Sequence, residues 1–195
     1  MTKLKIAILL FDEVEVLDFA GPFEVFSVTA QLSGYQCLEV ITVGKKHQLV
    51  RAKNGLKVMP DISMEALDAV DILVIPGGDG SKAVIQDKDL MAWIAMMTQK
   101  AKTVFSVCSG ARILAKLGHL AHQKFTTHHE VFESVLSLEP TAIPDPTARF
   151  VDNGKFMTAA GVAAGIDLSL YVVEKYFGEA EKQKTARYME YGEFN

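Results

Sequence analysis

The amino-acid sequence predicts one α/β domain over residues 1–195, built on a mainly parallel sheet with helices on both faces. Short apolar runs, typical of strands buried on both faces, alternate with segments that have helical spacing. Such alternation implies right-handed crossovers between parallel strands. The chain, with 195 residues of which 49% are hydrophobic, can bury a substantial core without disulfides. We find no internal repeat and no linker.

Strands are predicted where short apolar or β-rich runs end in turn residues. The first run, Leu4–Phe11, is almost continuously apolar. Asn54 and Gly55 lie between two β-rich runs and predict a hairpin, and a second hairpin turn is predicted at residues 152–154. The other predicted strands are residues 37–43, 71–76, 103–107 and 124–127.

Helices are predicted where apolar residues recur every three or four positions between start and stop signals. Gly21 and Pro22 are predicted to open the first helix, because proline is favoured at the first helical position, and Gly34 ends it after Leu32. Ser63 is predicted to cap a short helix. The later predicted helices cover residues 89–101, 109–118, 129–138 and 161–178.

Composition and charge exclude several classes of function. A net charge of -4 and a pI near 5.7 argue against binding to nucleic acid or an anionic membrane, because both need clustered Lys and Arg. The densest basic segment, Lys182–Arg187, is interpreted as the solvated face of a terminal helix. Only six apolar residues directly precede Asp12, too few for a signal peptide or a membrane span. A cytoplasmic protein is expected.

The two cysteines cannot make a disulfide framework, and neither has metal-ligand spacing. Cys108 follows the strand predicted at 103–107 and precedes a helical run. A nucleophile on such a sharp turn is presented to solvent, and the helix N-terminus stabilises its thiolate, so the pKa of Cys108 is predicted below the free value of about 8.5. A buried structural cysteine is the alternative. Cys37, inside a predicted strand, is interpreted as structural.

Two glycines follow the strand predicted at 71–76, where ligands of parallel sheets bind. Gly77 and Gly78 allow a tight turn that exposes backbone N–H groups. Together with the N–H of Ser109, these groups are predicted to hold an anion that develops on a substrate bound to Cys108. The alternative is a tight turn without a ligand.

Two carboxylates and two histidines are further candidates. Asp18 and Glu24 follow the first strand, and either is a helix cap or a general base that activates water. The sequence leaves open which of them is nearer Cys108. His128 and His129 end a predicted strand, so that one of them can face a site. No metal is predicted, because no third ligand stands at recognisable spacing.

These residues belong to a longer pattern. The motifs are LDFAGP, VIPGGDG, CSG, TTH, TAAG and AAGID, and they extend over nearly the whole chain. In this combination the chain resembles the ThiJ/PfpI superfamily, which is related to class I glutamine amidotransferases, and within it the isonitrile hydratase branch. The resemblance implies a flavodoxin-like three-layer sandwich with a nucleophile elbow. It also implies a small-molecule substrate, no cofactor and a homodimer.

Roles follow from the resemblance by position. It implies that Cys108 is the nucleophile, Asp18 the acid/base carboxylate and Ser109 a supporting hydroxyl. His128 takes the place of the histidine that the superfamily keeps near its cysteine. Ser109 stands where protease-like members have histidine, which argues against peptidase activity. His129 stands where hydratases commonly have Trp, so a different pocket is expected.

The function implied is a cysteine-dependent hydration of a small isonitrile to an N-substituted formamide. A first alternative is glyoxalase or deglycase chemistry on 2-oxoaldehydes, although members with that activity tend to have glutamate in place of Asp18. A second alternative is a redox- or ligand-sensing protein, because the same motifs occur in the sensor domains of AraC-type regulators. Those regulators carry an additional DNA-binding module, which is not expected here.

Overall fold

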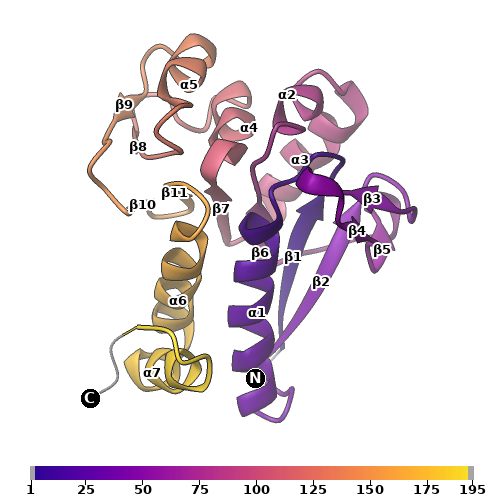
Figure 1. The fold of residues 1–195 in the computed structure, drawn as a ribbon, viewed down its shortest axis with the longest axis vertical. Coiled ribbons are helices and arrows are strands. Elements are labelled where there is room, and N and C mark those ends of the chain that lie inside the picture. The colour runs from indigo at the N-terminus through magenta and orange to yellow at the C-terminus, as the bar shows by residue number, and fades with distance from the viewer. Residues whose placement is uncertain (1–2, 193–195) are drawn as a thin grey trace.

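The computed structural model describes residues 3–192, which contain a central seven-stranded sheet (Figure 1). The strand order is β10-β11-β7-β6-β1-β2-β5, and every neighbouring pair is parallel except β10 with β11. The predicted mainly parallel sheet is therefore confirmed. Its strands are β1 (Leu4–Leu10), β2 (Leu38–Gly44), β5 (Ile62–Ser63), β6 (Ile72–Ile75), β7 (Thr103–Val107), β10 (Phe150–Asn153) and β11 (Phe156–Ala159).

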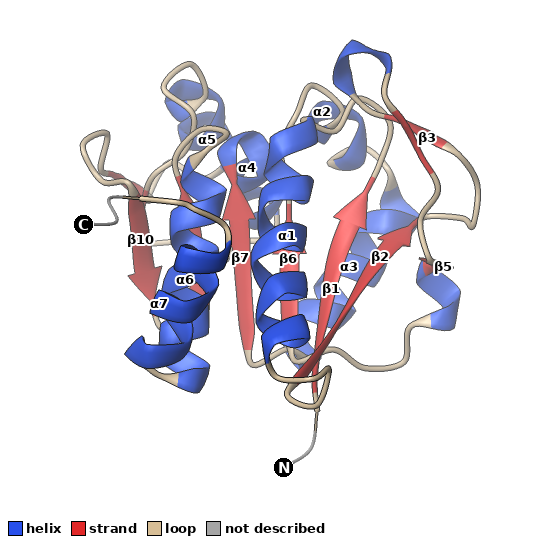
Figure 2. Ribbon diagram, turned by 60° about the horizontal axis from the view of Figure 1, so that its bottom comes forward, coloured by secondary structure: helices blue, strands red, loops and turns tan. Residues whose placement is uncertain are grey.

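Helices cover both faces of the sheet and complete three layers (Figure 2). The helices α1 (Val16–Leu32), α6 (Ala164–Phe177) and α7 (Glu179–Tyr188) pack together in front of the sheet in this view, and α3 (Lys88–Lys100) lies behind it. The shorter helices lie towards the end at which β1 and β7 point, and they are α2 (Ser81–Val84), α4 (Ala111–Lys116) and α5 (Phe132–Leu138). None of the helices described is long and apolar enough to cross a membrane.

The centre of the core is formed by β1, β6 and β7. Residues 6–9 of β1 have no exposed surface, and every residue of β6 is at most 1% exposed. Both faces of these strands are covered by helices, so their sequences are mainly apolar instead of alternating between apolar and polar residues. The core therefore fixes the three neighbouring strands whose carboxyl ends carry the candidate site.

Two short ribbons lie outside the main sheet. The strand β3 (Val50–Arg51) pairs antiparallel with β4 (Lys57–Val58), which confirms the hairpin predicted at Asn54 and Gly55. Both turn residues have positive φ, 63° and 94°, and this explains the Asn-Gly pair. A second ribbon joins β8 (Lys124–Phe125) to β9 (Ile143–Pro144) in parallel.

The first helix begins earlier than predicted. It starts at Val16, before Gly21, and therefore contains Pro22. Proline has no N–H to bond the carbonyl of Asp18, which costs the helix one hydrogen bond. The same turn packs closely on α6, because a Cβ added to Gly21 would lie 2.9 Å from Cγ1 of Ile166. The early start places Asp18 in the first turn of α1.

Three other boundaries also differ from the prediction. Ser63 precedes only a 3-10 turn, η2 (Met64–Ala66), and makes no side-chain cap hydrogen bond. The helix α5 begins at Phe132 and not at His129. The strand predicted at 124–127 ends at Phe125, because the N–H of Thr126 donates to the Thr158 hydroxyl in β11 and the Thr127 hydroxyl donates to the Cys108 carbonyl, instead of extending the ribbon.

Candidate active site

The turn after β7 holds Cys108 in a tightly fixed conformation. Its φ of 55° lies in the left-handed region that side-chain-bearing residues rarely adopt. The N–H of Cys108 donates to the carbonyl of Ala160 at 3.0 Å, and the hydroxyl of Thr127 donates to the carbonyl of Cys108 at 2.6 Å. A 3-10 turn, η3 (Cys108–Gly110), then leads into α4. The predicted sharp strand-to-helix turn is present.

Gly110 allows this turn to lie close to β6. Its φ of -58° and ψ of -23° suit any residue, so glycine is not required for its conformational freedom. A Cβ at this position would lie only 2.2 Å from the carbonyl oxygen of Ile75. The absence of a side chain therefore lets the Cys108 turn pack directly against the neighbouring strand end.

Asp18 lies beneath the sulfur of Cys108. Its side chain has no exposed surface, and Oδ2 accepts a hydrogen bond from the N–H of Gly77 at 2.9 Å. Among the residues described, Oδ1 has no hydrogen-bond partner, and the carboxylate is close enough to the Cys108 thiol for each group to affect the pKa of the other. Glu24 lies two turns further along α1 on the exposed surface and does not line the Cys108 pocket. The structure thus brings Asp18 to the cysteine and keeps Glu24 away from it.

The pKa values of the two groups are both raised. Burial, with a smaller effect from the charge of Glu15, raises the pKa of Asp18 to about 7. Burial and the nearby charge of Asp18 raise the pKa of Cys108 to about 12, although the N–H groups of Val162 and Ser109 bond the sulfur and oppose this rise. The predicted low thiol pKa is therefore wrong, because burial outweighs the turn's N–H groups. At neutral pH the thiol is protonated and Asp18 is about half ionised.

The hydroxyl of Ser109 ties the Cys108 turn to the glycine turn. Its Oγ accepts from the N–H of Gly78 at 2.8 Å, and the N–H of Gly77 is bonded to Asp18. Both glycine N–H groups that were predicted to hold a substrate anion are therefore occupied within the protein. A Cβ on Gly77 would lie 2.5 Å from the nitrogen of Ser109, so glycine serves close packing here.

His128 lies at the rim of the site. Its ring packs on Gly161, where a Cβ would lie 2.6 Å from the ring carbon Cδ2. Its Nδ1 accepts from the N–H of Glu130 at 3.3 Å, which leaves Nε2 to carry the proton of the neutral ring. His129 points to solvent, with a side chain that is 81% exposed. Of the two neighbours, only His128 lines the Cys108 pocket.

The structure also shows a cluster that could hold a cation. Ligand atoms of His128, His129 and Glu130 lie within 4.8 Å of one another, so a third ligand does exist beside the histidine pair. This third ligand, Glu130, directly follows His129, and such adjacent spacing is not a recognisable metal-ligand pattern, so the sequence did not predict it. Glu130 is 76% exposed and the Nδ1 of His128 is already bonded, so the cluster is not a preorganised site.

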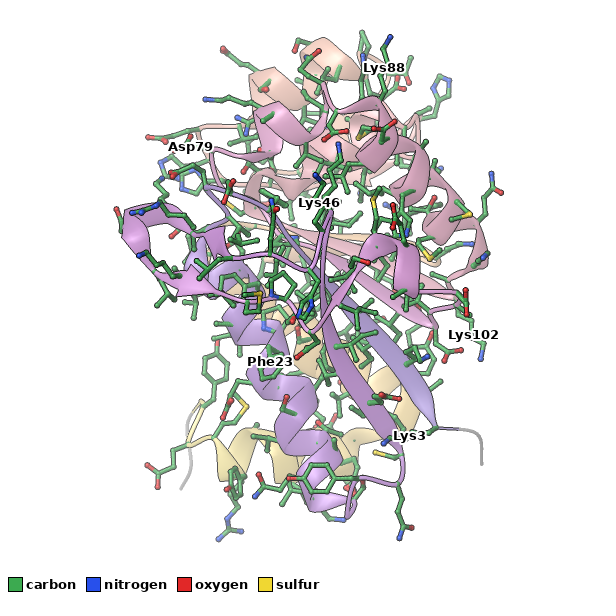
Figure 3. All side chains as sticks on the ribbon, turned by 90° about the vertical axis from the view of Figure 1, so that its right-hand side faces the viewer. Lys3, Phe23, Lys46, Asp79, Lys88 and Lys102 are labelled. Atoms are coloured by element: carbon green, nitrogen blue, oxygen red, sulfur yellow. The ribbon has the colours of Figure 1, made fainter. Side chains whose placement is uncertain are left out.

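A cavity of about 230 Å³ opens over Cys108 at the carboxyl end of the sheet. Figure 3 shows this end at the top, where Asp79 follows β6, whereas Lys3, which precedes β1, lies at the bottom. Besides the predicted residues Cys108, Gly78, Ser109 and His128, the cavity is lined by Glu15, Lys53, Asp79, Lys82, Arg112, Glu130, Val131 and Val162. A cavity of this size suits a small molecule.

The charged residues of the pocket were missed by the sequence analysis. Lys53 lies beside the hairpin turn and its ammonium group is 3.6 Å from Glu15 and 3.4 Å from Asp79. Arg112 lies one helical turn after Cys108, and it is only 7% exposed. An arginine within the apolar run ARILAKL, four positions from a candidate nucleophile, was the signal that could have identified it.

Comparisons with known proteins agree with this architecture. The model of the DJ-1/PfpI family matches residues 4–175. The isonitrile hydratase of Pseudomonas putida is 29% identical over 188 residues, which cover 96% of this chain and 78% of that protein. The transcriptional regulator GbdR of Pseudomonas aeruginosa is 24% identical over 89% of this chain, which spans only 47% of the regulator. A ThiJ/PfpI family protein from Pseudomonas syringae has a TM-score of 0.89 at 28% identity, covering 100% of this chain and 78% of that one.

Proposed function

Because this chain belongs to the DJ-1/PfpI family, we propose that it is a cysteine-dependent enzyme that adds water to a small isonitrile and releases an N-substituted formamide. The observation that carries the proposal is that the Cys108 thiol faces a small cavity while the buried carboxylate of Asp18 lies close enough to affect the pKa of that thiol. The likeness to an isonitrile hydratase over 96% of the chain supports this reaction among those that a thiol and a carboxylate can perform.

The first half of the reaction forms a covalent intermediate. The Asp18 carboxylate takes the thiol proton while the sulfur of Cys108 attacks the terminal carbon of the isonitrile. Asp18 then returns the proton to that carbon, which gives a thioimidate, R–N=CH–S–Cys. The pKa of Asp18, near 7, suits a group that both accepts and donates this proton at neutral pH.

The second half hydrolyses the intermediate. The Asp18 carboxylate removes a proton from water as the water oxygen attacks the thioimidate carbon, and this proton passes to the nitrogen. The C–S bond then breaks, the hydroxyl proton returns to the sulfur, and R–NH–CHO leaves. One water is consumed, so atoms and charge balance without a redox partner.

The alternative of a redox sensor is less well supported. Sensor cysteines combine exposure with a low pKa, whereas Cys108 is 7% exposed and has a pKa raised to about 12. A ligand-binding role without catalysis keeps support from the likeness to a transcriptional regulator. Turnover therefore has to be measured directly.

The test is an assay with cyclohexyl isonitrile and, separately, methylglyoxal, in which formamide and lactate are quantified. We expect formamide from the wild type, a loss of at least about 10³-fold for Cys108→Ala, and a loss of about 10² to 10⁴-fold for Asp18→Asn. Cys37→Ala is the matched control, because Cys37 bonds the Ser33 hydroxyl outside the pocket.

Three outcomes would contradict the proposal. Formamide production that survives Cys108→Ala would exclude the covalent route. Lactate without formamide would move the function to glyoxalase chemistry. No turnover of either compound, together with ligand-induced stabilisation of the fold, would favour a binding protein.

A further inference from the structure

Arg112 is a buried cation with only neutral partners. Its Nε donates to the hydroxyl of Ser134 at 2.8 Å, and its Nη1 donates to the hydroxyl of Ser81 at 2.9 Å. Within residues 3–192 no carboxylate forms an ion pair with its guanidinium. Arg112 is nevertheless only 7% exposed. Buried charges in proteins are normally paired, because an uncompensated charge loses its hydration.

The acidic residues nearby are engaged elsewhere. Asp79 lies 3.4 Å from the ammonium group of Lys53 and 3.7 Å from that of Lys82, and Lys53 also pairs with Glu15. The third carboxylate of the pocket, Glu130, is 76% exposed. None of these three carboxylates lies within ion-pair distance of the guanidinium, so only the longer-range charge of Asp79 opposes the buried positive charge of Arg112.

The guanidinium is also held in place. Ser81, which receives Nη1, itself donates to the carbonyl of Gly78 at 2.8 Å, so this anchor is part of the glycine turn. Ser134 anchors the other side from α5. A guanidinium has five N–H donors, and the two hydroxyls take two of them. The remaining donors belong to a fixed group that lines the same cavity as Cys108.

From this arrangement we propose that Arg112 binds the carboxylate of a small substrate and places its electrophilic carbon at Cys108. Guanidinium and carboxylate form the strongest common charge-assisted hydrogen bonds, and the ligand would supply the missing counterion. The identity of the electrophile rests on the function proposed above, so for that reaction the substrate class is a small isonitrile that carries a carboxylate. The anion site itself does not depend on the reaction.

The test compares two alkylating reagents that differ in charge. Iodoacetate and iodoacetamide both react by attack of the Cys108 sulfur on the methylene carbon with loss of iodide, and only iodoacetate carries a carboxylate. The Cys37→Ala protein would be used so that mass spectrometry follows a single thiol. The readout is the ratio of the iodoacetate rate to the iodoacetamide rate, which cancels changes in the reactivity of the thiol.

We expect the ratio to fall about tenfold or more in Arg112→Met and to fall less in Arg112→Lys, which keeps the charge but not the planar donors. Lys82→Met removes a charge from the exposed rim and should shift the ratio by less than about twofold. Sodium acetate should also slow the alkylation by iodoacetamide in the wild type and not in Arg112→Met.

The proposal is overturned if Arg112→Met changes both rates equally, since Arg112 would then act only on the thiolate. It is also overturned if acetate fails to protect the wild type. Should Arg112→Met fold poorly, Ser134→Ala keeps the charge and removes one anchor, and an unchanged ratio in that variant contradicts a preorganised site. Neither reagent is an isonitrile, so failure of the hydratase proposal would leave these rates unaffected.

Discussion

At the scale of single residues, Cys108 and Asp18 form one chemical unit. Burial raises the pKa of both groups, and the negative charge of Asp18 raises the pKa of Cys108 further, whereas the thiol lowers the pKa of Asp18 by a smaller amount. A protonated thiol beside a half-ionised carboxylate differs from the activated thiolate that a helix N-terminus alone would produce. Under the proposed mechanism, the sulfur stays unreactive until a substrate arrives and its proton can pass to Asp18.

This coupling predicts opposite effects of one substitution on two reactions. Asp18→Asn removes the repelling charge, so the pKa of Cys108 should fall and iodoacetamide should alkylate it about tenfold or more faster at pH 8. The same variant should lose formamide production, because the proton carrier is gone. Mass spectrometry of alkylated protein measures the first effect. Slower alkylation would show that Asp18 activates the thiol in the free protein.

At the scale of elements, the site depends on close contacts between turns. The glycine turn after β6 meets the Cys108 turn after β7 and the first turn of α1, and hydrogen bonds from Gly77 and Gly78 join all three. The helices and strands bring the backbones of these three turns within contact distance of one another. Such a close approach is possible only at residues without a side chain, which are the glycines.

The Gly110 position gives a test at this scale. Gly110→Ala should destabilise the protein by about 1–3 kcal/mol, because the added Cβ meets the carbonyl of Ile75 at 2.2 Å and backbone must move. Urea denaturation measures the change, and turnover should fall with it as the Cys108 turn shifts.

Gly21→Ala is the matched control for that substitution. Its added Cβ meets Cγ1 of Ile166 at 2.9 Å, but a side chain can rotate away, and alanine favours the helix interior by up to about 1 kcal/mol. We expect the free energy of unfolding to change by less than about 1 kcal/mol. Equal destabilisation by both variants would mean that the approach to Ile75 does not explain the glycine.

At the scale of the whole molecule, strand order brings the parts of the site together. β6 pairs with both β1 and β7, so the carboxyl ends of all three strands meet at one edge of the sheet. Residues that are 90 positions apart in the sequence, Asp18 and Cys108, thereby come close enough to affect each other's pKa. Burial of this pair in the folded protein links its ionisation to global stability.

The linkage predicts how stability changes with pH. The pKa of Asp18 is about 7 when folded and 3.8 as the reference value, so below about pH 4 both states hold the proton. As the pH rises from 4 to 7 only the unfolded state loses it, and the free energy of unfolding falls by about 4 kcal/mol from this group. Above pH 7 the contribution is constant.

Comparison with Asp18→Asn isolates that contribution. The difference in the free energy of unfolding between wild type and variant should decrease from pH 4 to pH 8, since groups that titrate alike in both proteins cancel. Urea denaturation at several pH values provides the measurement. A difference that does not change with pH would mean that Asp18 has an ordinary pKa in the folded protein.

The sequence by itself determined the alternation of strands and helices, the Asn-Gly hairpin and the turn at Cys108, because each depends on neighbours in the chain. Local patterns also identified Asp18, Ser109 and His128, which all lie at or beneath the pocket. Their roles stay predictions until the variants are assayed.

Tertiary structure decided the rest. The exclusion of Glu24, the occupied N–H groups of Gly77 and Gly78, the high thiol pKa of Cys108 and the unpaired charge of Arg112 all arise from burial and from contacts between distant segments. Hydrogen bonding and desolvation depend on what surrounds a group in space, and a linear pattern does not specify those surroundings. The chemistry of this site is therefore set by the packing of three strand ends, although its residues were visible in the sequence.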